Sequence, residues 1–277
     1  MTRLSAITRW IRATIDRQRE ALADEGTLTY LRTRPQAALG AFGTLLLSMD
    51  SRRMDPDEVQ ERWAERSGVY SPEFYADMGT TGGTESIRSV LDARVDRDAT
   101  ILEVGCSAGR HLEHLREHGY ENLHGIDLNE DASDVMAERY PELAEDGTFY
   151  WEPLEDVLPR LEDGQFDVVF SVEALQHIHP DNEWVFGEIG RVTDNLLVTK
   201  ENEPDGDQLL RTTQVEDFPL YFRQWKPIFT DLGFTQLART EDTVDTLRVF
   251  YREDSALALE DDDRVVDEAG KRSPVEN

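Results

Sequence analysis

One short stretch limits the fold more than any other part of this 277-residue chain. The run Ile101–Val104 is apolar apart from one acid, and a loop with glycines at 105 and 109 follows it. His111–Leu115 then resumes at helical spacing. A strand, a tight glycine turn and a helix in this order are how an α/β sheet forms a nucleotide-binding edge. Glycine serves there because the backbone can approach a ligand with no Cβ in the way.

The spacing of this loop argues against a dinucleotide as the ligand. The pattern is Glu-x-Gly-x-x-x-Gly, because position 107 is Ser, and the acid Glu103 lies directly before the turn. A carboxylate there repels a pyrophosphate and attracts an ammonium group. A second apolar run, His124–Asn129, carries Asp127 at its end, where a carboxylate can accept hydrogen bonds from both hydroxyls of a ribose. Together the two acids predict a ligand that has an amine and a ribose.

In their order and spacing, these elements resemble the class I S-adenosylmethionine-dependent methyltransferases. The resemblance runs from about residue 80 to about residue 252, and residues 101–129 are its most specific part. It implies S-adenosylmethionine as the cofactor, with its amine at Glu103 and its ribose at Asp127. The further cofactor contacts that it implies are Gly105, Cys106, Ser107, Gly109, Leu128, Leu154 and Ser171.

The alternation of elements after residue 100 predicts the fold class. Strands are expected near 100–104, 122–127, 147–151, 166–171, 195–200, 233–239 and 245–252. Helices are expected near 108–119, 130–140, 154–160, 181–192 and 219–232. Such alternation favours a doubly wound α/β fold, a mainly parallel seven-stranded sheet with helices on both faces. The resemblance adds a Rossmann-like topology with an antiparallel last strand, for which Thr246–Tyr251 fits.

The adenine contacts depart from the family pattern. Related enzymes often place an acid for the adenine amino group directly before an apolar residue that packs on the ring. If Leu154 is that apolar residue, Pro153 occupies the position of the acid and has no side-chain acceptor. Glu152, Glu155 and Asp156 are the alternatives for this contact.

The stretch after the fourth strand is expected to face the methyl acceptor. It lacks the Asn-Pro-Pro-Tyr loop that grips the amino group of a base, and it resembles the Glu-x-x-x-His form of small-molecule O-methyltransferases and quinone-pathway enzymes. His177 is the candidate general base, because an ordinary imidazole titrates near neutral pH. The alternative is a structural histidine that closes the loop. Glu173, His177 and His179 could also hold a divalent metal, but no further ligand clusters with them, and we predict no metal site.

The charge balance indicates the solvent for which the chain is adapted. The chain has 58 acidic residues against 29 lysines and arginines, a formal net charge of −29. Such a surface repels itself in ordinary buffer, whereas molar salt shortens the Debye length to about 3 Å. We therefore predict a halophilic protein, with a chain adapted to a basic partner as the alternative. The acidity also argues against nucleic acid as a partner. The lone cysteine, Cys106, is assigned a packing role rather than a reactive one.

Three segments are expected along the chain. Residues 1–53 are basic, with nine arginines against five acids and an amphipathic helical pattern, and 54–252 form the catalytic domain. Residues 253–277 are an acidic tail expected to be disordered. The first segment is interpreted as a helical cap or dimer contact, with a peripheral membrane anchor as the alternative. Its Arg-rich start has no apolar core before a cleavage site, which favours a cytoplasmic protein, peripheral to the membrane if the anchor exists.

The resemblance and the residues together predict a methyltransferase that acts on a small-molecule or lipid-like acceptor, at oxygen. One alternative is a protein or RNA methyltransferase. Another is a cofactor-binding protein without transfer activity, whose N-terminal region is an interaction module. A nicotinamide dehydrogenase is disfavoured by the glycine spacing and by Glu103. The oligomeric state is not predicted from the sequence.

Overall fold

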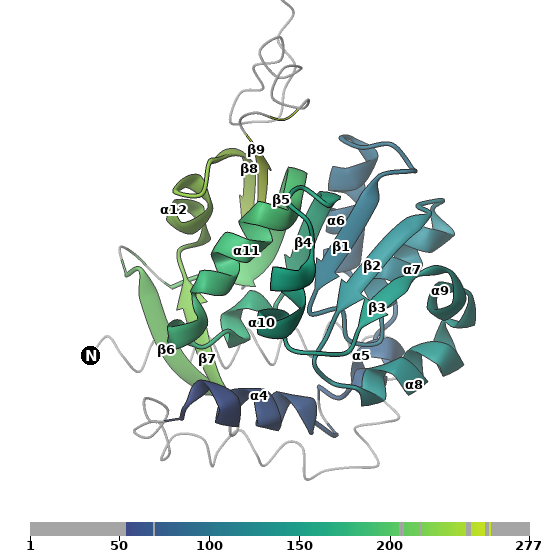
Figure 1. Ribbon diagram of the computed structural model, residues 1–277, viewed down its shortest axis with the longest axis horizontal. Helices are drawn as coiled ribbons and strands as arrows, with labels where there is room; N and C mark the ends of the chain where they lie inside the picture. The colour runs from purple at the N-terminus through teal and green to yellow at the C-terminus, as the bar shows by residue number, and fades with distance from the viewer. Residues whose placement is uncertain are drawn as a thin grey trace, which may run out of the picture.

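A computed structural model shows how the predicted elements are arranged (Figure 1). It describes residues 54–68, 70–204, 206, 208–215, 218–241, 245–252 and 255. The basic segment 1–53 lies outside the described residues, and so does the acidic tail 253–277 apart from Ser255.

A mainly parallel sheet of seven strands is the centre of the fold, in the order β3-β2-β1-β4-β5-β9-β8. Its strands are β1 Thr100–Val104, β2 Asn122–Ile126, β3 Thr148–Tyr150, β4 Phe166–Val172, β5 Thr193–Asn202, β8 Phe234–Glu241 and β9 Asp245–Arg252. The first five pair in parallel, and β9 runs antiparallel to both β5 and β8. The predicted fold class is confirmed, including the antiparallel last strand.

Helices alternate with these strands along the chain. The α-helices are α4 Pro56–Ala64, α5 Pro72–Asp77, α6 Gly82–Asp92, α7 Arg110–Glu117, α8 Asp131–Arg139, α9 Pro141–Asp146, α10 Leu154–Val157, α11 Trp184–Val192 and α12 Trp225–Thr230. Three short 3-10 helices are η3 Leu158–Arg160, η4 Leu175–His177 and η5 Pro180–Asn182.

Both faces of the central strands β1 and β4 are buried, which explains why these two strands read as nearly continuous apolar runs. Successive residues of β1 point to opposite faces. Leu102 belongs to the core cluster beneath α11 and α12, whereas Ile101 belongs to the cluster beneath α6 and α7 (Figure 1). Because Glu103 lies on the same face as Ile101, its carboxylate points toward α7.

A second, two-stranded sheet was missed from the sequence. It consists of β6 Leu210–Val215 and β7 Phe218–Arg223, paired antiparallel. The predicted helix over 219–232 was therefore wrong in its first half, and only Trp225–Thr230 is helical. Phe218, Tyr221 and Phe222 favour a strand once β6 supplies a partner. This hairpin and α4 lie on the same side of the main sheet as the carboxyl ends of its parallel strands (Figure 1).

The end of the fifth strand also differs from the expectation. A strand is expected near 195–200, but β5 continues to Asn202 because β9 pairs with it that far. Glu201 is 0% exposed. The side chain of Glu203 is 8% exposed, with its Oε1 2.6 Å from Nε of Arg248. The side chains of Glu201 and Glu203 therefore lie in the interior.

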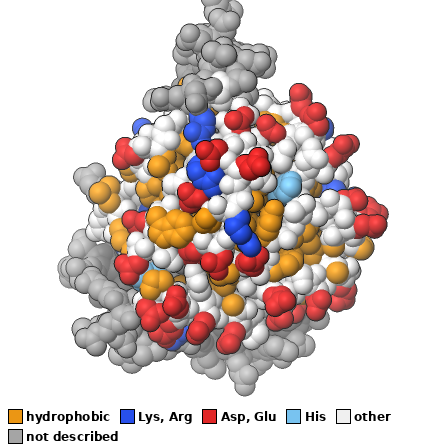
Figure 2. All heavy atoms as spheres, in the orientation of Figure 1, with side chains coloured by type: hydrophobic (Ala, Val, Ile, Leu, Met, Phe, Trp, Pro, Cys, Tyr) orange, Lys and Arg blue, Asp and Glu red, His pale blue; other side chains and the backbone are white. Residues whose placement is uncertain are grey.

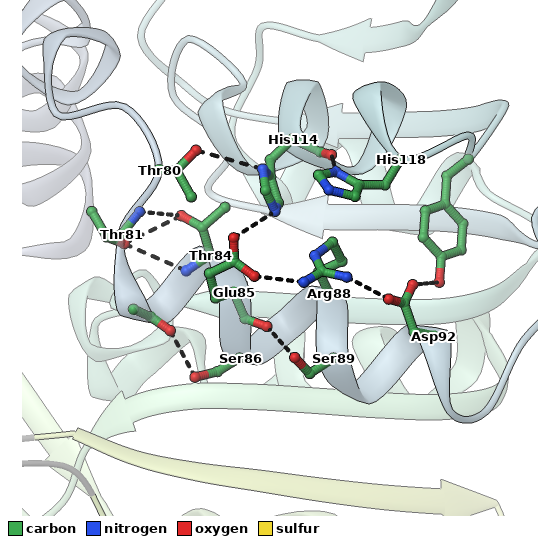
Figure 3. Close-up of polar contacts among 12 residues, drawn as sticks. Thr80, Thr81, Thr84, Glu85, Ser86, Arg88, Ser89, Asp92, His114 and His118 are labelled. Atoms are coloured by element: carbon green, nitrogen blue, oxygen red, sulfur yellow. Dashed lines mark hydrogen bonds and ion pairs between the residues drawn. The ribbon is translucent and has the colours of Figure 1, made fainter.

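Polar contacts fix α6 against α7, the helix that follows the glycine loop (Figure 3). Thr81 and Thr84 form a capping box at the start of α6. Arg88 bridges Glu85 and Asp92 along the helix. Glu85 also lies 3.3 Å from Nε2 of His114 on α7, and this contact helps to hold the start of α7 in place.

Acidic side chains are spread over the surface and outnumber Lys and Arg on the face drawn in Figure 2. In the described part of the chain, no helix has the length and apolarity needed to cross a membrane.

Candidate functional site

The glycine loop adopts a backbone conformation that requires glycine at two positions. Gly105 has φ +76° and Gly109, the N-cap of α7, has φ +84°. A Cβ on Gly105 would lie 2.3 Å from the Cβ of Ala174, and one on Gly109 would lie 2.7 Å from Cε of Met136. Ser107, between them, has φ +47°, a left-handed conformation that is uncommon outside glycine. The turn is therefore closely fitted to its surroundings.

Asp127 lies directly beyond β2 and binds this loop. Its Oδ2 accepts a hydrogen bond from the Ser107 amide at 2.8 Å, and its Oδ1 accepts one from the Asn129 amide at 2.9 Å. Burial raises the pKa of Asp127, and the backbone donors at Asn129 and Ser107 oppose that shift. A carboxylate has about four acceptor positions, and the backbone donors at Asn129, Ser107 and Leu128 leave one of them for a ligand hydroxyl.

Glu103 lies on β1, two residues before the first glycine of the loop. It is 1% exposed, and its Oε1 is 2.6 Å from Nδ1 of His111 on α7. Its other oxygen, Oε2, is buried and has no hydrogen-bond partner among the described residues. A buried carboxylate oxygen without a donor is costly, and a ligand ammonium group would satisfy it.

The electrostatic surroundings of Glu103 fit the same ligand group. Burial raises the pKa of Glu103 well above its usual range, with Arg110 opposing the rise and Asp127 adding to it. Burial also lowers the pKa of His111, so the pair favours its neutral forms. A cation beside Oε2 would favour the ionised carboxylate. The residues present therefore fit S-adenosylmethionine at both its amine and its ribose end.

Three other predicted cofactor residues come from three segments: Cys106 from the loop itself, Leu128 from just beyond β2, and Leu154 from α10. Cys106 is buried, and a Cβ on Gly125 would lie 2.6 Å from its Sγ, so Cys106 packs against β2. Burial raises the pKa of this thiol well above its usual range, which makes it a poor nucleophile. Leu128 follows Asp127 and is partly exposed, and Leu154 begins α10 at the margin of the core.

The hydroxyl of Ser171, a predicted cofactor contact near the end of β4, makes a hydrogen bond within the protein. It donates to Oε1 of Glu201 at 2.7 Å and is buried. Through this bond Ser171 joins the ends of β4 and β5. Glu201 was not singled out from the sequence as a site residue.

The loop after β4 carries the candidate acceptor residues. Glu173 has φ +54°, and its amide donates to the carbonyl of Lys200 at 2.9 Å. His177 ends η4, and its ring centroid is 4.1 Å from that of Trp63 on α4. Burial, with Arg66 adding to it, lowers the pKa of His177 to about 3. Its Nδ1 is buried and has no hydrogen-bond partner among the described residues.

Aromatic rings and one guanidinium group cover this side of the site. The Arg66 guanidinium lies 3.9 Å from the Phe218 ring, 4.3 Å from Trp63 and 4.7 Å from Tyr70. Such contacts between a cation and aromatic faces are favourable, and more so when they are desolvated. Arg66 thereby ties α4 to β7 above the loop that carries His177.

Sequence reasoning missed His111, Arg66 and Glu201. His111 and Arg66 carry no sequence signal, because their partners are distant in the chain. Glu201 does carry one, an acid at the end of an apolar strand, as in Glu103 and Asp127. Among the described residues, no group of three His, Cys, Asp or Glu side chains is placed to hold a metal ion.

Comparison with known proteins agrees with this geometry. Residues 102–195 match the family model described as a methyltransferase domain. The chain is 33% identical over 118 residues to the mitochondrial ubiquinone biosynthesis O-methyltransferase of Saccharomyces cerevisiae, covering 41% of this chain and 36% of that protein. It is 29% identical over 112 residues to phosphoethanolamine N-methyltransferase 2 of Caenorhabditis elegans, covering 39% of this chain and 25% of that protein. The matches thus span about a third or less of these relatives.

A solved structure supports the fold. The magnesium protoporphyrin IX methyltransferase of Synechocystis PCC 6803, with bound SAH, superposes with a TM-score of 0.54. It covers 72% of this chain and 100% of the other at 16% identity, a similarity that extends to the fold alone. The matched domain, the strand order and the acid-flanked glycine loop agree, and residues 102–195 are identified as a methyltransferase domain whose fold is similar to that of the class I S-adenosylmethionine-dependent enzymes.

Proposed function

We propose that this protein transfers a methyl group from S-adenosylmethionine to a small-molecule or lipid-like acceptor, at oxygen. The observation that carries the proposal is the pair of buried carboxyl groups that adjoin one glycine turn, Glu103 directly before it and Asp127 bonded to it. Glu103 has a buried carboxylate oxygen that accepts no hydrogen bond from the described part of the chain. Asp127 accepts hydrogen bonds from the backbone of Ser107 and Asn129 and can accept a further one from a ligand hydroxyl.

In this proposal the residues at and beside the glycine turn hold different parts of the cofactor. Glu103 binds the amine, Asp127 accepts from a ribose hydroxyl, and the backbone at Gly105 and Gly109 allows close approach. Leu128 and Leu154 are the apolar residues proposed to flank the adenine.

The cofactor supplies a methyl group already activated on a sulfonium. The protein therefore has to align the acceptor with that group and keep water away from it. In this proposal the loop with Glu173 and His177 contacts the methyl acceptor. Helix α4 and the β6–β7 hairpin cover that loop. The contacts of Trp63 with His177 and with Phe218, at ring-centroid distances of 4.1 and 4.5 Å, support this arrangement.

The environment of His177 limits the kind of hydroxyl that it can help to ionise. With a pKa of about 3, the imidazole is neutral near neutral pH and is a weak base. Its buried Nδ1 suits a hydroxyl that donates to it and is itself acidic, such as a phenol or an enol. This argument favours an acceptor oxygen with an acidic proton over an aliphatic alcohol.

The relatives support a small acceptor but differ in the accepting atom. One is named as an O-methyltransferase of ubiquinone biosynthesis and the other as an N-methyltransferase of phosphoethanolamine. A protein or RNA methyltransferase is the second candidate within enzymes. A cofactor-binding protein without transfer activity is the candidate from another class.

A direct assay distinguishes these candidates. Purified protein in molar KCl is incubated with methyl-labelled S-adenosylmethionine and a cell extract, and S-adenosylhomocysteine and labelled products are followed by mass spectrometry. The proposal expects a labelled small molecule, whereas label in protein or RNA would replace it with the second candidate. Cofactor binding without turnover in any fraction would favour the non-catalytic candidate, and absence of calorimetric binding would overturn the cofactor assignment.

The peripheral membrane contact of residues 1–53 also stays a proposal. Its support is the basic amphipathic pattern of that segment. Full-length protein and a variant lacking residues 1–53 are each pelleted with anionic vesicles. The anchor predicts that only the full-length protein sediments, and equal sedimentation would exclude it.

A further inference from the structure

The loop between β4 and η4 has to be held in place if it is to present Glu173 and His177. Glu173 is in a left-handed conformation, with φ +54°, which is costly for a residue with a side chain. Such a conformation persists only when the surrounding contacts determine it. The backbone of the next two residues shows what those contacts are.

Glu201 supplies several of them, beside the carbonyl of Lys200 that accepts from the Glu173 amide. Its Oε1 accepts hydrogen bonds from the amides of Ala174 at 3.0 Å and Leu175 at 3.1 Å. The same oxygen accepts a third bond from the Ser171 hydroxyl at 2.7 Å. One carboxylate oxygen thus accepts hydrogen bonds from a side chain near the end of β4 and from two consecutive backbone amides of the loop. Glu201 is 0% exposed, so water cannot replace these bonds.

The loop that Glu201 holds touches the glycine loop directly. The Cβ of Ala174 lies in the space that a Cβ on Gly105 would need, at a separation of 2.3 Å. A displacement of Ala174 would therefore change the packing at Gly105. Contacts thus run from Glu201 through Ala174 to the proposed cofactor turn.

The charged groups that act on Glu201 come from two other elements. Glu173 lies on the β4 loop, and Arg223 lies at the end of β7. Lys200, which pairs with Asp245 of β9, points to the other face of the sheet, because successive residues of a strand alternate faces. Burial raises the pKa of Glu201 to about 7, and the Ser171, Leu175 and Ala174 donors oppose the rise. An acceptor oxygen is present in either protonation state, so the hold on the loop does not require the charge.

We propose that Glu201 is a positioning residue for the methyl transfer, whose buried acceptor oxygen holds the Glu173–His177 loop against the glycine turn. The role in transfer rests on the proposed function above. The hold on the loop does not, and it can be measured separately.

The test compares three replacements at position 201. Glu201→Leu removes the acceptor oxygen, and Glu201→Gln keeps it. Glu201→Asp keeps the charge but withdraws the oxygen from the amides, and it replaces the Leu variant should that one not fold. Thr199→Val is the matched control, because Thr199 is buried on the same strand and the same face, and its hydroxyl has no hydrogen-bond partner among the described residues.

Two measurements are made on each full-length variant in molar KCl. Hydrogen exchange of the Ala174 and Leu175 amides reports on the loop, and calorimetric binding of S-adenosylhomocysteine reports on the turn. We expect Glu201→Leu and Glu201→Asp to lose about tenfold in both amide protection and affinity, the equivalent of one or two neutral hydrogen bonds. Glu201→Gln should stay within about twofold of wild type, as should Thr199→Val.

The outcomes separate the two proposals. Unchanged protection in Glu201→Leu, or a loss in Glu201→Gln equal to that in Glu201→Leu, would overturn the positioning role. The three Glu201 variants could instead show an equally lowered thermal transition temperature, with amide protection and affinity unchanged. That result would mean that Glu201 has only a structural role. If wild type does not bind S-adenosylhomocysteine, the proposed function fails, whereas the exchange comparison still decides whether Glu201 holds the loop.

Discussion

The carboxylate of Asp127 accepts a hydrogen bond from the backbone amide of Ser107, 20 residues earlier in the chain, at 2.8 Å. The residue proposed to bind the ribose therefore also fixes the glycine turn on which the ligand would lie. Binding and loop geometry are coupled in one side chain, and a substitution there should affect both.

Asp127→Ala is expected to weaken S-adenosylhomocysteine binding by about 2–3 kcal/mol, the cost typical of truncating one side of a buried, charge-assisted pair. Calorimetry in molar KCl measures the change. Asp156→Asn, at an acid predicted only as an alternative adenine contact, is the comparison and should lose far less. An affinity that Asp127→Ala leaves intact would refute the ribose assignment.

Gly105→Ala should abolish measurable binding of S-adenosylhomocysteine, because its Cβ would lie 2.3 Å from that of Ala174 and because φ is +76°. The double variant Gly105→Ala with Ala174→Gly removes the collision and keeps the backbone strain, about 1–2 kcal/mol. Partial recovery of binding in the double variant is the expected result. No recovery would mean that the contact with Ala174 does not limit the turn.

The imidazole of His177 should remain neutral across the physiological range. Burial and Arg66 lower its pKa to about 3, so its NMR resonances, assigned with a His177→Gln variant, should not titrate between about pH 5 and pH 8. A midpoint near pH 6.5 would show that the ring is solvated, and would restore it as an ordinary general base.

Glu201 should make the protein less stable as the pH rises. Because burial raises its pKa from 4.5 to about 7, the folded state keeps a proton that the unfolded state has lost between these two values. Stability therefore falls through this window, by up to about 3 kcal/mol for this group. Denaturant unfolding at pH 5 and pH 8 should show a smaller fall in Glu201→Gln. An equal fall in both proteins would assign the effect to other groups.

Removal of salt should unfold the chain. The formal charge of −29 is screened in molar KCl, where the Debye length is about 3 Å, and is exposed as the ionic strength decreases. Circular dichroism during dialysis into low-salt buffer should lose its helical signal, and returning KCl should recover it. A spectrum that does not change would contradict the prediction of salt adaptation.

Local sequence was sufficient where a feature depends on neighbours in the chain. The strand, glycine turn and helix at 100–117 were predicted because apolar periodicity and glycine spacing are local properties. The mainly parallel sheet followed from the regular alternation of elements. The first half of the predicted 219–232 helix was wrong, because a strand at 218–223 depends on pairing with β6, which local pattern does not specify.

The sequence by itself determined the class of fold, the glycine turn and the two carboxylates at the ends of β1 and β2. Strand ends and glycine spacing can be recognised from consecutive residues. Only the tertiary structure decided that His111 bonds Glu103, that Arg66 is enclosed by three rings, and that Glu201 holds the β4 loop. In each case the partners come from different elements, and burial in a shared interior gives the contact its strength. A hydrogen bond that is worth little in water fixes a loop when no water can replace it.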